Sequence, residues 1–519
     1  MNEVELKLAA GPAALKRLAA APSLAAKTRG KVVTLQLDNR YFDTSDLKLY
    51  HNRLALRVRK SGGRYVQTLK ADPESSEVIR RGEWEAPVES ARPDLAALPD
   101  PLPVETPLKI RADRLKSLFS SRIRRQVRII ETPGADGTTN EIEVAVDRGV
   151  VAANRRSLAV SEMELQLLKG EPEALYRVAI DLQRIAPFRL MTLSKSARGY
   201  GLASGLPPRW RKAERIRLEP EASIDDAWLA VIKACQAQWT ANEAAALDGR
   251  SPEGVHQVRV GLRRFRSALT IFADLLPDDQ LTWLKTEAKW ILGALGAARE
   301  WDVLATELLP KKPNADLGAG ALRVLKVAVE RERRRGYERA RRALQSARYT
   351  RFQLRFGMWI EGHGWRQDAT PANAALKGPA LPFAAKVLEA RHRKVLKRGD
   401  GFAEQSAVDR HRLRLALKTL RYTTEFFRSL HRKGRVAAYL KRLTRLQEGL
   451  GRYNDVMVTE HLLKPFLAAE GGRDRAPLAA AAAAVIAYHR RRLAAGEKAL
   501  RRDWRDFVRA RHFWGDDRR

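Results

Sequence analysis

The chain has two parts that differ in the spacing of their apolar and polar residues. In the first part, short segments alternate between polar and apolar side chains, which is typical of half-buried β-strands. In the second part, apolar positions recur with a period near 3.6 residues, which predicts α-helices. A segment rich in proline and charge, and without either period, lies between them. We therefore predict a domain at 1–204, a linker at 205–221 and a helical domain at 222–510.

The alternating segments of the first part predict its strands. Ser61, Gly62 and Gly63 give a turn signal between two of these segments. Between other strands the spacing becomes helical, so we also expect a few helices. The expected strands are 2–8, 54–60, 64–70, 82–88, 141–147 and 160–168, and the expected helices are 12–21, 107–119 and 171–186.

The second part contains an internal duplication. The segment HQVRVGLRRFRSAL, which begins at His256, matches HRLRLALKTLRYTT, which begins at His411. Each copy is followed by a segment with glycine that ends in an aspartate, Asp302 in the first copy and Asp455 in the second. Two matched blocks in the same order indicate a repeat. We expect two related helical bundles, with internal repeats at about 222–350 and 380–510.

The composition narrows the compartment and the class of partner. The formal net charge is +36, from 97 basic and 61 acidic residues, and most of the excess lies in the second part. Such a charge attracts polyanions. Cys235 is the single cysteine, which excludes an intramolecular disulfide framework. The sequence shows neither a signal peptide nor an apolar run long enough for a membrane span. We expect a cytoplasmic protein without a membrane partner.

Charged side chains share faces on several predicted strands. Glu3, Glu5 and Lys7 project from one face of the first strand, while Val4 and Leu6 project from the other. A flat sheet would expose these charges to water. A sheet that closes with the charges inside would need water, cations and an anion in its lumen, because unpaired buried charge is costly. Carboxylates bind Mg²⁺ or Mn²⁺, and basic side chains bind phosphate oxygens. The inferred ligand is a metal-chelated polyphosphate.

An ordered set of motifs across residues 1–202 resembles the CYTH family of triphosphate tunnel metalloenzymes. The motifs are EVELK at 3–7, LRVR at 56–59, TLK at 68–70, RRGEWE at 80–85, RIRRQVR at 122–128, VDRG at 146–149, SEMELQ at 161–166 and SKSARGY at 194–200. The resemblance implies an α+β domain, an antiparallel β-tunnel or barrel with helices outside. It also implies divalent-metal-dependent hydrolysis of a triphosphate, with Mg²⁺ or Mn²⁺ as the cofactor.

The resemblance implies a role for each matching residue. The implied metal ligands are Glu3, Glu5, Asp147, Glu162 and Glu164. The implied substrate-binding residues are Lys7, Arg57, Arg59, Lys70, Arg81, Arg125, Lys195 and Arg198. The implied catalytic set is Glu3, Glu5, Lys7 and Glu164. Gln166 stands where many members have a third glutamate. Either register of the basic strand 122–128 is compatible with the sequence.

The duplicated helices carry a basic stripe beside an apolar one. His256, Arg259, Arg263 and Arg266 are spaced so that they share one side of a helix, and the second copy repeats the pattern. A solvated charged face is the ordinary interpretation, but solvation alone does not require the same register twice. The pattern resembles the CHAD family, which implies polyphosphate binding. The implied polyphosphate-binding residues are His256, Arg259, Arg263, Arg266, His411, Arg414, Lys418 and Arg421.

We predict an inorganic triphosphatase that converts tripolyphosphate to diphosphate and phosphate and is coupled to a polyphosphate-binding helical domain. The alternatives are a hydrolase or cyclase that acts on thiamine triphosphate or ATP, and a non-catalytic polyphosphate-binding protein. Nucleic acid is not expected as a specific partner. We expect Asp302 and Asp455 to be structural, orienting an arginine of the basic helix.

Overall fold

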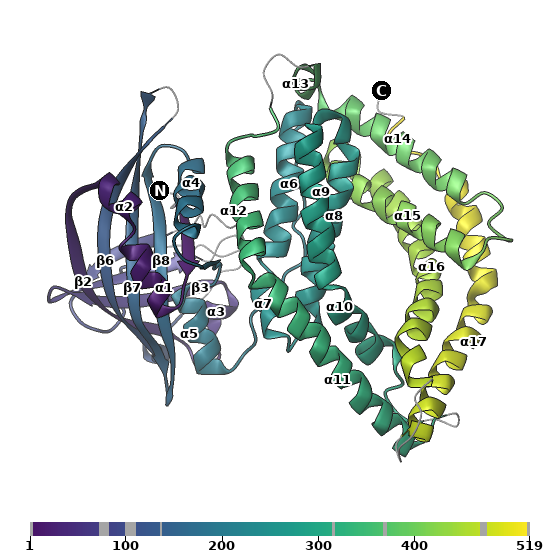
Figure 1. Cartoon of the computed structure of the whole chain (residues 1–519), viewed down its shortest axis with the longest axis horizontal. Coiled ribbons are helices and arrows are strands. Elements are labelled where there is room, and N and C mark those ends of the chain that lie inside the picture. Colours follow the sequence, from purple (N-terminus) through teal and green to yellow (C-terminus); the bar gives the residue numbers. More distant parts are fainter. Residues whose placement is uncertain are drawn as a thin grey trace. The chain divides into compact units, whose positions relative to one another are not determined.

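The computed structural model describes residues 4–71, 83–98, 110–134, 137–313, 317–366, 371–467 and 475–515. These residues form two compact units. The first unit comprises residues 1–211 together with 240–254 and 343–364, and the second comprises 212–239, 255–342 and 365–519. The first unit contains the sheet and the second is helical (Figure 1). In the described part of the chain, no helix is long and apolar enough to cross a membrane.

The first unit is built on one antiparallel sheet of nine strands in the order β5-β4-β3-β2-β6-β7-β8-β1-β9. The long strands β2, β6, β7 and β8 form its centre. The strands are β1 Val4–Ala9, β2 Thr28–Asp43, β3 Leu54–Ser61, β4 Arg64–Ala71, β5 Glu83–Val88, β6 Lys116–Pro133, β7 Thr139–Ala153, β8 Arg156–Lys169 and β9 Arg189–Leu190. The helices around the sheet are α1 Pro12–Ala19, α2 Pro22–Lys27, α3 Lys48–His51, α4 Glu173–Gln183 and α5 Lys195–Ser204.

Apolar alternate positions pack the outer face of the sheet against helices. Leu6 of β1 and Val144 of β7 are fully buried in one cluster with Leu15 of α1 and Leu175 of α4. A two-residue period places every apolar side chain of such a strand on this one face. The opposite, charged face is therefore the inner one, as predicted for a tunnel.

One of the expected elements is wrong, and the sequence pattern missed β2, β9, α2, α3 and α5. Residues 107–119 were expected to be helical, but 107–109 lie outside the described residues, Ala112–Arg114 is a short 3₁₀ turn, and β6 begins at Lys116. The apolar spacing there fits both periods over so short a segment. Strand β2 was not predicted. The positions of β2 that face inward are apolar at Leu35 and Leu37 but polar at Asn39, so the alternation of apolar and polar residues is interrupted.

The second unit is helical, as the 3.6-residue period predicted. Its helices are α6 Ile224–Thr240, α8 Pro252–Ile271, α9 Asp278–Ala294, α10 Gly296–Val303, α11 Ala319–Leu344, α13 Pro371–Leu376, α14 Ala380–Arg398, α15 Ala407–Phe427, α16 Lys433–Leu467 and α17 Arg475–Val508. Two further helices, α7 Glu243–Asp248 and α12 Ala347–Glu361, belong to the first unit.

The matched helices of the duplication are α8 and α15. Equivalent aromatic rings, Phe272 just after α8 and Phe427 at the end of α15, lie 6.2 Å apart between centroids. The two copies are therefore neighbours in space.

Candidate active site and anion-binding helices

A cavity inside the sheet is lined by charged side chains from strands at both ends of the strand order. Glu5 and Lys7 come from β1, Arg57 and Arg59 come from β3, and Lys70 comes from β4. Strands so far apart in the order can line one cavity only if the sheet curves around it (Figure 1). The predicted charged lumen is therefore present.

The strand register brings the acidic residues together. Glu164 of β8 pairs with Lys7 of β1, Glu162 of β8 pairs with Asp147 of β7, and Asp147 pairs with Arg125 of β6. Directly paired residues of an antiparallel sheet point to the same face. Their side chains therefore converge on the inner face.

The same register resolves the orientation of the basic strand. Arg125 lines the cavity. Arg122, Arg124 and Arg128 differ from it by an odd number of positions and so point to the opposite face. Arg128 donates from Nη2 to the carbonyl of Ala19 at the end of α1, at 3.0 Å. Of the arginines at 122–128, Arg125 is the one that faces the cavity.

Three carboxylates form a compact cluster at one wall of the cavity. One carboxylate oxygen each from Asp147, Glu162 and Glu164 lies within 4.8 Å of the other two. Asp147 and Glu162 are fully buried, and 9% of Glu164 is exposed. Charges this deeply buried require partners of opposite sign.

Cations supply those partners at short distances. Lys195, the first residue of α5, places Nζ 2.6 Å from Asp147 Oδ2, 2.5 Å from Glu162 Oε1 and 2.9 Å from Glu164 Oε1. Arg125 donates to both oxygens of Asp147, from Nε at 2.8 Å and from Nη2 at 2.6 Å, and Nη2 also contacts Glu164. Helix α5 begins at Lys195 because Ser194 caps it, accepting from the backbone N–H of Ala197 at 3.0 Å.

The remaining contacts of this wall are also ion pairs. Arg198 Nη2 lies 2.5 Å from Glu162 Oε2. Lys7 Nζ lies 3.1 Å from Glu164 Oε1 and 3.3 Å from Glu5 Oε1. Charge is therefore nearly balanced on this side of the cavity.

The ion pairs fix the charge states. Burial alone would raise the pKa of Glu164, but Lys195 and then Lys7 and Arg125 hold it well below its usual value. Burial alone would lower the pKa of Lys195, but Glu164, Glu162 and Asp147 raise it. The carboxylate of Glu164 and the ammonium of Lys195 therefore stay charged at neutral pH.

The opposite wall carries an excess of positive charge. Arg57 Nη2 donates to Thr68 Oγ1 at 3.0 Å and lies 3.5 Å from Glu85 Oε1. Arg59 Nε donates to Asn39 Oδ1, a neutral acceptor, at 3.1 Å. Burial, followed by repulsion from Arg57 and Arg125, lowers the pKa of Arg59 to about 10. An anion bound here would relieve that repulsion.

In the second unit, basic residues of α8 and α15 face one another. Burial, followed by repulsion from Arg414, Arg263, Arg421 and Arg259, lowers the pKa of Lys418 to about 6. These cations come from both helices.

The arginines of this cluster are themselves incompletely satisfied. The buried Nε atoms of Arg263 and Arg414 have no hydrogen-bond partner among the described residues. Burial, followed by Arg263, lowers the pKa of Arg259 to about 10. The cluster of cations on α8 and α15 is therefore a candidate anion-binding site.

Comparison with known proteins gives the same two-part division. Residues 1–200 match the CYTH domain, and residues 230–464 match the CHAD domain. The chain holds a CYTH domain followed by a CHAD domain. The predicted family resemblance of both parts is confirmed.

Relatives match either one domain or both. The inorganic triphosphatase of Haemophilus influenzae is 30% identical over 207 residues, which is 39% of this chain and 56% of that protein. An uncharacterized protein of Mycobacterium tuberculosis is 26% identical over 463 residues, 84% of this chain and 83% of that protein. The crystal structure of the CHAD domain from the plant Ricinus communis has 32% sequence identity and a TM-score of 0.50, and covers 58% of this chain and 98% of that chain.

The CYTH domain brings most of its predicted site residues to one place. Glu3 and Arg81 lie outside the described residues. Glu162 and Arg198 do not line the cavity themselves, but they contact Lys195 or each other behind its acidic wall. The predicted residues that line the cavity are Glu5, Lys7, Arg57, Arg59, Lys70, Arg125, Asp147, Glu164 and Lys195.

The sequence prediction missed several cavity residues. Asn39 and Tyr41 lie on β2, and their alternation with charged neighbours was a usable signal. Ser194 and Ser196 flank Lys195 and also line the cavity. No pattern in the sequence indicated these two serines beyond their place in the SKSARGY motif.

The carboxylate cluster of the CYTH domain fits a hard divalent cation. Its donors are all carboxylate oxygens, the ligand type that Mg²⁺ and Mn²⁺ prefer. Glu162 Oε1 is buried, and Lys195 Nζ lies 2.5 Å from it. A cation, the Lys195 ammonium, therefore already lies beside this oxygen.

In the CHAD domain, the duplicated residues differ in exposure and charge. Arg266 is exposed, whereas its counterpart Arg421 is partly buried and lies 3.4 Å from Glu425. Burial, followed by Arg414 and Lys418, lowers the pKa of His411. The imidazole of His411 is therefore mostly neutral at neutral pH.

The two aspartates of the repeat have different neighbours. Asp302 is fully buried and accepts from Arg333 Nε at 2.7 Å and from Tyr337 OH at 2.8 Å, both on α11. The expectation that it orients an arginine of α8 is therefore wrong. Asp455 interacts electrostatically with Arg414 of α15, which matches the expectation.

Proposed function

We propose that the CYTH domain is a divalent-metal-dependent inorganic triphosphatase and that the CHAD domain binds inorganic polyphosphate. One observation carries the enzymatic part: a single curved sheet encloses a cavity with clustered carboxylates on one wall and surplus arginine and lysine on the other. A chelated triphosphate presents cations to the first wall and phosphate oxygens to the second. The similarity of residues 1–200 to the CYTH domain and to an inorganic triphosphatase supports this assignment.

The cavity residues have two roles, because the basic side chains bind the phosphates and the carboxylates would hold the metal. Arg57, Arg59 and Lys70 bind phosphate oxygens through charge-assisted hydrogen bonds and hold the chain in line with the incoming water. Asp147, Glu162 and Glu164, with Glu3 and Glu5, would hold Mg²⁺ or Mn²⁺. When bound, the metal neutralises phosphate charge and lowers the pKa of water.

Hydrolysis in this cavity requires no covalent intermediate. Water attacks the terminal phosphorus, the bond from that phosphorus to the bridging oxygen breaks, and diphosphate leaves with the bonding electron pair. The proton lost by the attacking water passes to solvent. Positive charge from Arg57, Arg59 and Arg125 stabilises the transferring group, because phosphoryl transfer depends mainly on positioning and charge neutralisation.

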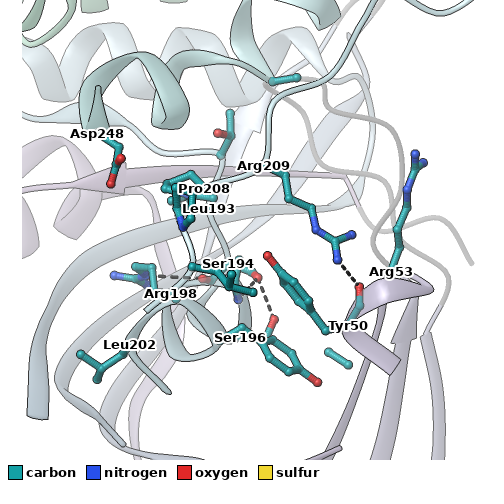
Figure 2. A pocket seen from close by; sticks show the side chains of 18 of the residues that line it. Tyr50, Arg53, Leu193, Ser194, Ser196, Arg198, Leu202, Pro208, Arg209 and Asp248 are labelled. Carbon is teal, nitrogen blue, oxygen red and sulfur yellow. Dashed lines mark hydrogen bonds between the residues drawn. The ribbon is translucent and has the colours of Figure 1, made fainter. Parts of the chain in front are cut away.

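A specific observation favours organic triphosphates as a second candidate substrate. Beside the tunnel lies a cavity of about 410 Å³ that shares Lys70, Ser194 and Ser196 with it (Figure 2). The rings of Tyr50 and Tyr200 line this cavity, and the guanidinium of Arg209 stacks 3.8 Å over the Tyr50 ring. Such a recess suits an aromatic group, as in ATP or thiamine triphosphate.

The CHAD proposal rests on the cation cluster of α8 and α15. Arg263, Arg414 and Lys418 repel one another across the two helices. A linear polyanion would bind these groups and remove the repulsion, without a divalent metal. The duplicated placement of the cations supplies successive contacts along one chain of phosphates.

A substrate screen tests the enzymatic proposal. Purified protein is incubated with tripolyphosphate, long polyphosphate, ATP or thiamine triphosphate, each with Mg²⁺ or Mn²⁺, and phosphate release is measured. We expect metal-dependent release that is fastest from tripolyphosphate, and its loss in Glu164→Gln. Faster turnover of ATP or thiamine triphosphate would favour the second candidate. No hydrolysis of any of them would refute the triphosphatase assignment, whereas hydrolysis undiminished in Glu164→Gln would refute the role of Glu164 as a metal ligand.

A further inference from the structure

The ammonium of Lys195 stands at the centre of the carboxylate cluster. Its Nζ lies 2.6, 2.5 and 2.9 Å from oxygens of Asp147, Glu162 and Glu164. Among the described cations, it alone forms ion pairs with all three carboxylates, since Arg125 contacts only Asp147 and Glu164. Lys195 thus takes the position that a shared cation would take.

A divalent cation and this ammonium cannot use the cluster at the same time. Metal–oxygen distances are about 2.0–2.6 Å for such ions. A cation bound to the oxygens that Lys195 now contacts would lie within a few ångströms of Nζ, with charges of the same sign and little water between them. One of the two must leave.

We propose that Lys195 is the internal counter-cation of the metal site and that divalent metal binding displaces it into the tunnel. This inference rests on the metal assignment of the proposed function. In the metal-free protein, Lys195 neutralises Asp147, Glu162 and Glu164. After displacement, its ammonium is freed from the carboxylates and binds phosphate oxygens in the same cavity, which it already lines. Substrate binding by Lys195 then follows metal binding.

The surroundings of α5 leave room for this movement. Lys195 is the first residue of α5, whose first turn is held by the Ser194 cap and by the ion pair of Arg198 with Glu162. The cavity of about 410 Å³ borders the same helix, and Ser194, Ser196, Arg198 and Leu202 line it (Figure 2). Arg198 pairs with Glu162 and Gly199 packs against Phe119, so the displacement is a rotation of the Lys195 side chain into the tunnel that it already lines.

The test is a calorimetric titration of the full chain with Mn²⁺ in the absence of any phosphate. Lys195→Met removes the competing charge and retains the length of the side chain, so we expect Mn²⁺ to bind about tenfold more tightly or better than in the wild type. Lys195→Arg keeps the charge and should bind near the wild-type level. The control is Lys16→Met, an exposed lysine of α1 outside the cavity, which should have no effect.

Thermal unfolding gives a second measurement on the same proteins. Metal-free Lys195→Met leaves three clustered carboxylates without this partner, so its midpoint should be lower than that of the wild type. Saturating Mn²⁺ should then raise the midpoint more in the variant than in the wild type. An equal shift in both proteins would contradict the displacement.

The outcomes separate this inference from the proposed function. Equal or weaker Mn²⁺ affinity in Lys195→Met, with clear binding by the wild type, would overturn the inference and leave the metal assignment intact. No Mn²⁺ binding by either protein would overturn both. If the variant does not fold, amine modification of the wild type decides: Lys195 should react faster with an acylating reagent once Mn²⁺ is added, and an unchanged or slower rate would overturn the proposal.

Discussion

Binding of polyphosphate to the CHAD domain should take up a proton at Lys418. Burial and the charges of Arg414, Arg421, Arg263 and Arg259 lower the pKa of this side chain to about 6. In the free protein at pH 7 it is therefore protonated in roughly a tenth of molecules. A polyanion that reverses the repulsion restores the pKa toward its usual value, near 10.4.

The magnitude follows from linkage. At pH 7, full protonation on binding corresponds to an uptake of about 0.9 proton per site. Above pH 7, the protonated fraction of Lys418 in the free protein falls about tenfold for each pH unit. The affinity for polyphosphate should therefore fall about tenfold from pH 7 to pH 8. The sign is fixed: a depressed lysine pKa makes polyanion binding weaker as pH rises.

Calorimetry in buffers of different ionisation enthalpy measures this uptake directly. Long polyphosphate is used because terminal phosphates titrate near pH 6 and contribute little in a long chain. Lys418→Arg keeps the charge and should abolish the buffer dependence while binding is retained. If the wild type binds polyphosphate at pH 7.5 with the same heat in every buffer, then Lys418 takes up no proton on binding and the prediction is wrong.

Three further predictions concern the two sites. Glu164→Gln should abolish metal-dependent phosphate release while circular dichroism stays unchanged, and wild-type turnover at saturating metal would contradict its role as a ligand. Arg57→Ala should lose roughly 1.5–3 kcal/mol of substrate binding, read as a decrease in kcat/KM toward tripolyphosphate; unchanged kinetic constants would count against an inward-facing Arg57. Arg263→Gln should weaken polyphosphate binding and reduce the slope of log affinity against log salt by about 0.7 if one phosphate contact is lost, whereas an unchanged slope in a salt titration would place binding elsewhere.

The inner face of the sheet was predictable where polar and apolar residues alternate without interruption. Two strands show this, β1 with Glu5 and Lys7 and β8 with Glu162 and Glu164. Their charged side chains face inward because they alternate with apolar side chains that are buried on the outer face. Asn39 on β2 was not predicted. The preceding positions on the same face of β2 are the apolar residues Leu35 and Leu37, so the face did not look like part of a charged cavity.

Contacts between distant segments lay beyond the sequence pattern. The position of Lys195 among three carboxylates depends on where α5 begins relative to β7 and β8, which periodicity does not encode. The duplicated register on α8 and α15, by contrast, did single out both Arg263 and Arg414, which the structure brings close enough to interact electrostatically. It did not predict the partner of Asp302, because Arg333 lies on a helix outside both matched blocks.

Net positive charge does not distinguish the two anion sites, but the placement of carboxylates does. In the tunnel, the surplus cations Arg57 and Arg59 face a wall of buried Asp147 and Glu164, so a bare polyanion would meet negative charge as well as positive. An anion that brings its own divalent cation satisfies both walls. Between α8 and α15, the charged groups that lower the pKa of Lys418, in addition to burial, are all cations, so a bare chain of phosphates suffices. Metal dependence should accordingly separate hydrolysis from polyphosphate binding within this one chain.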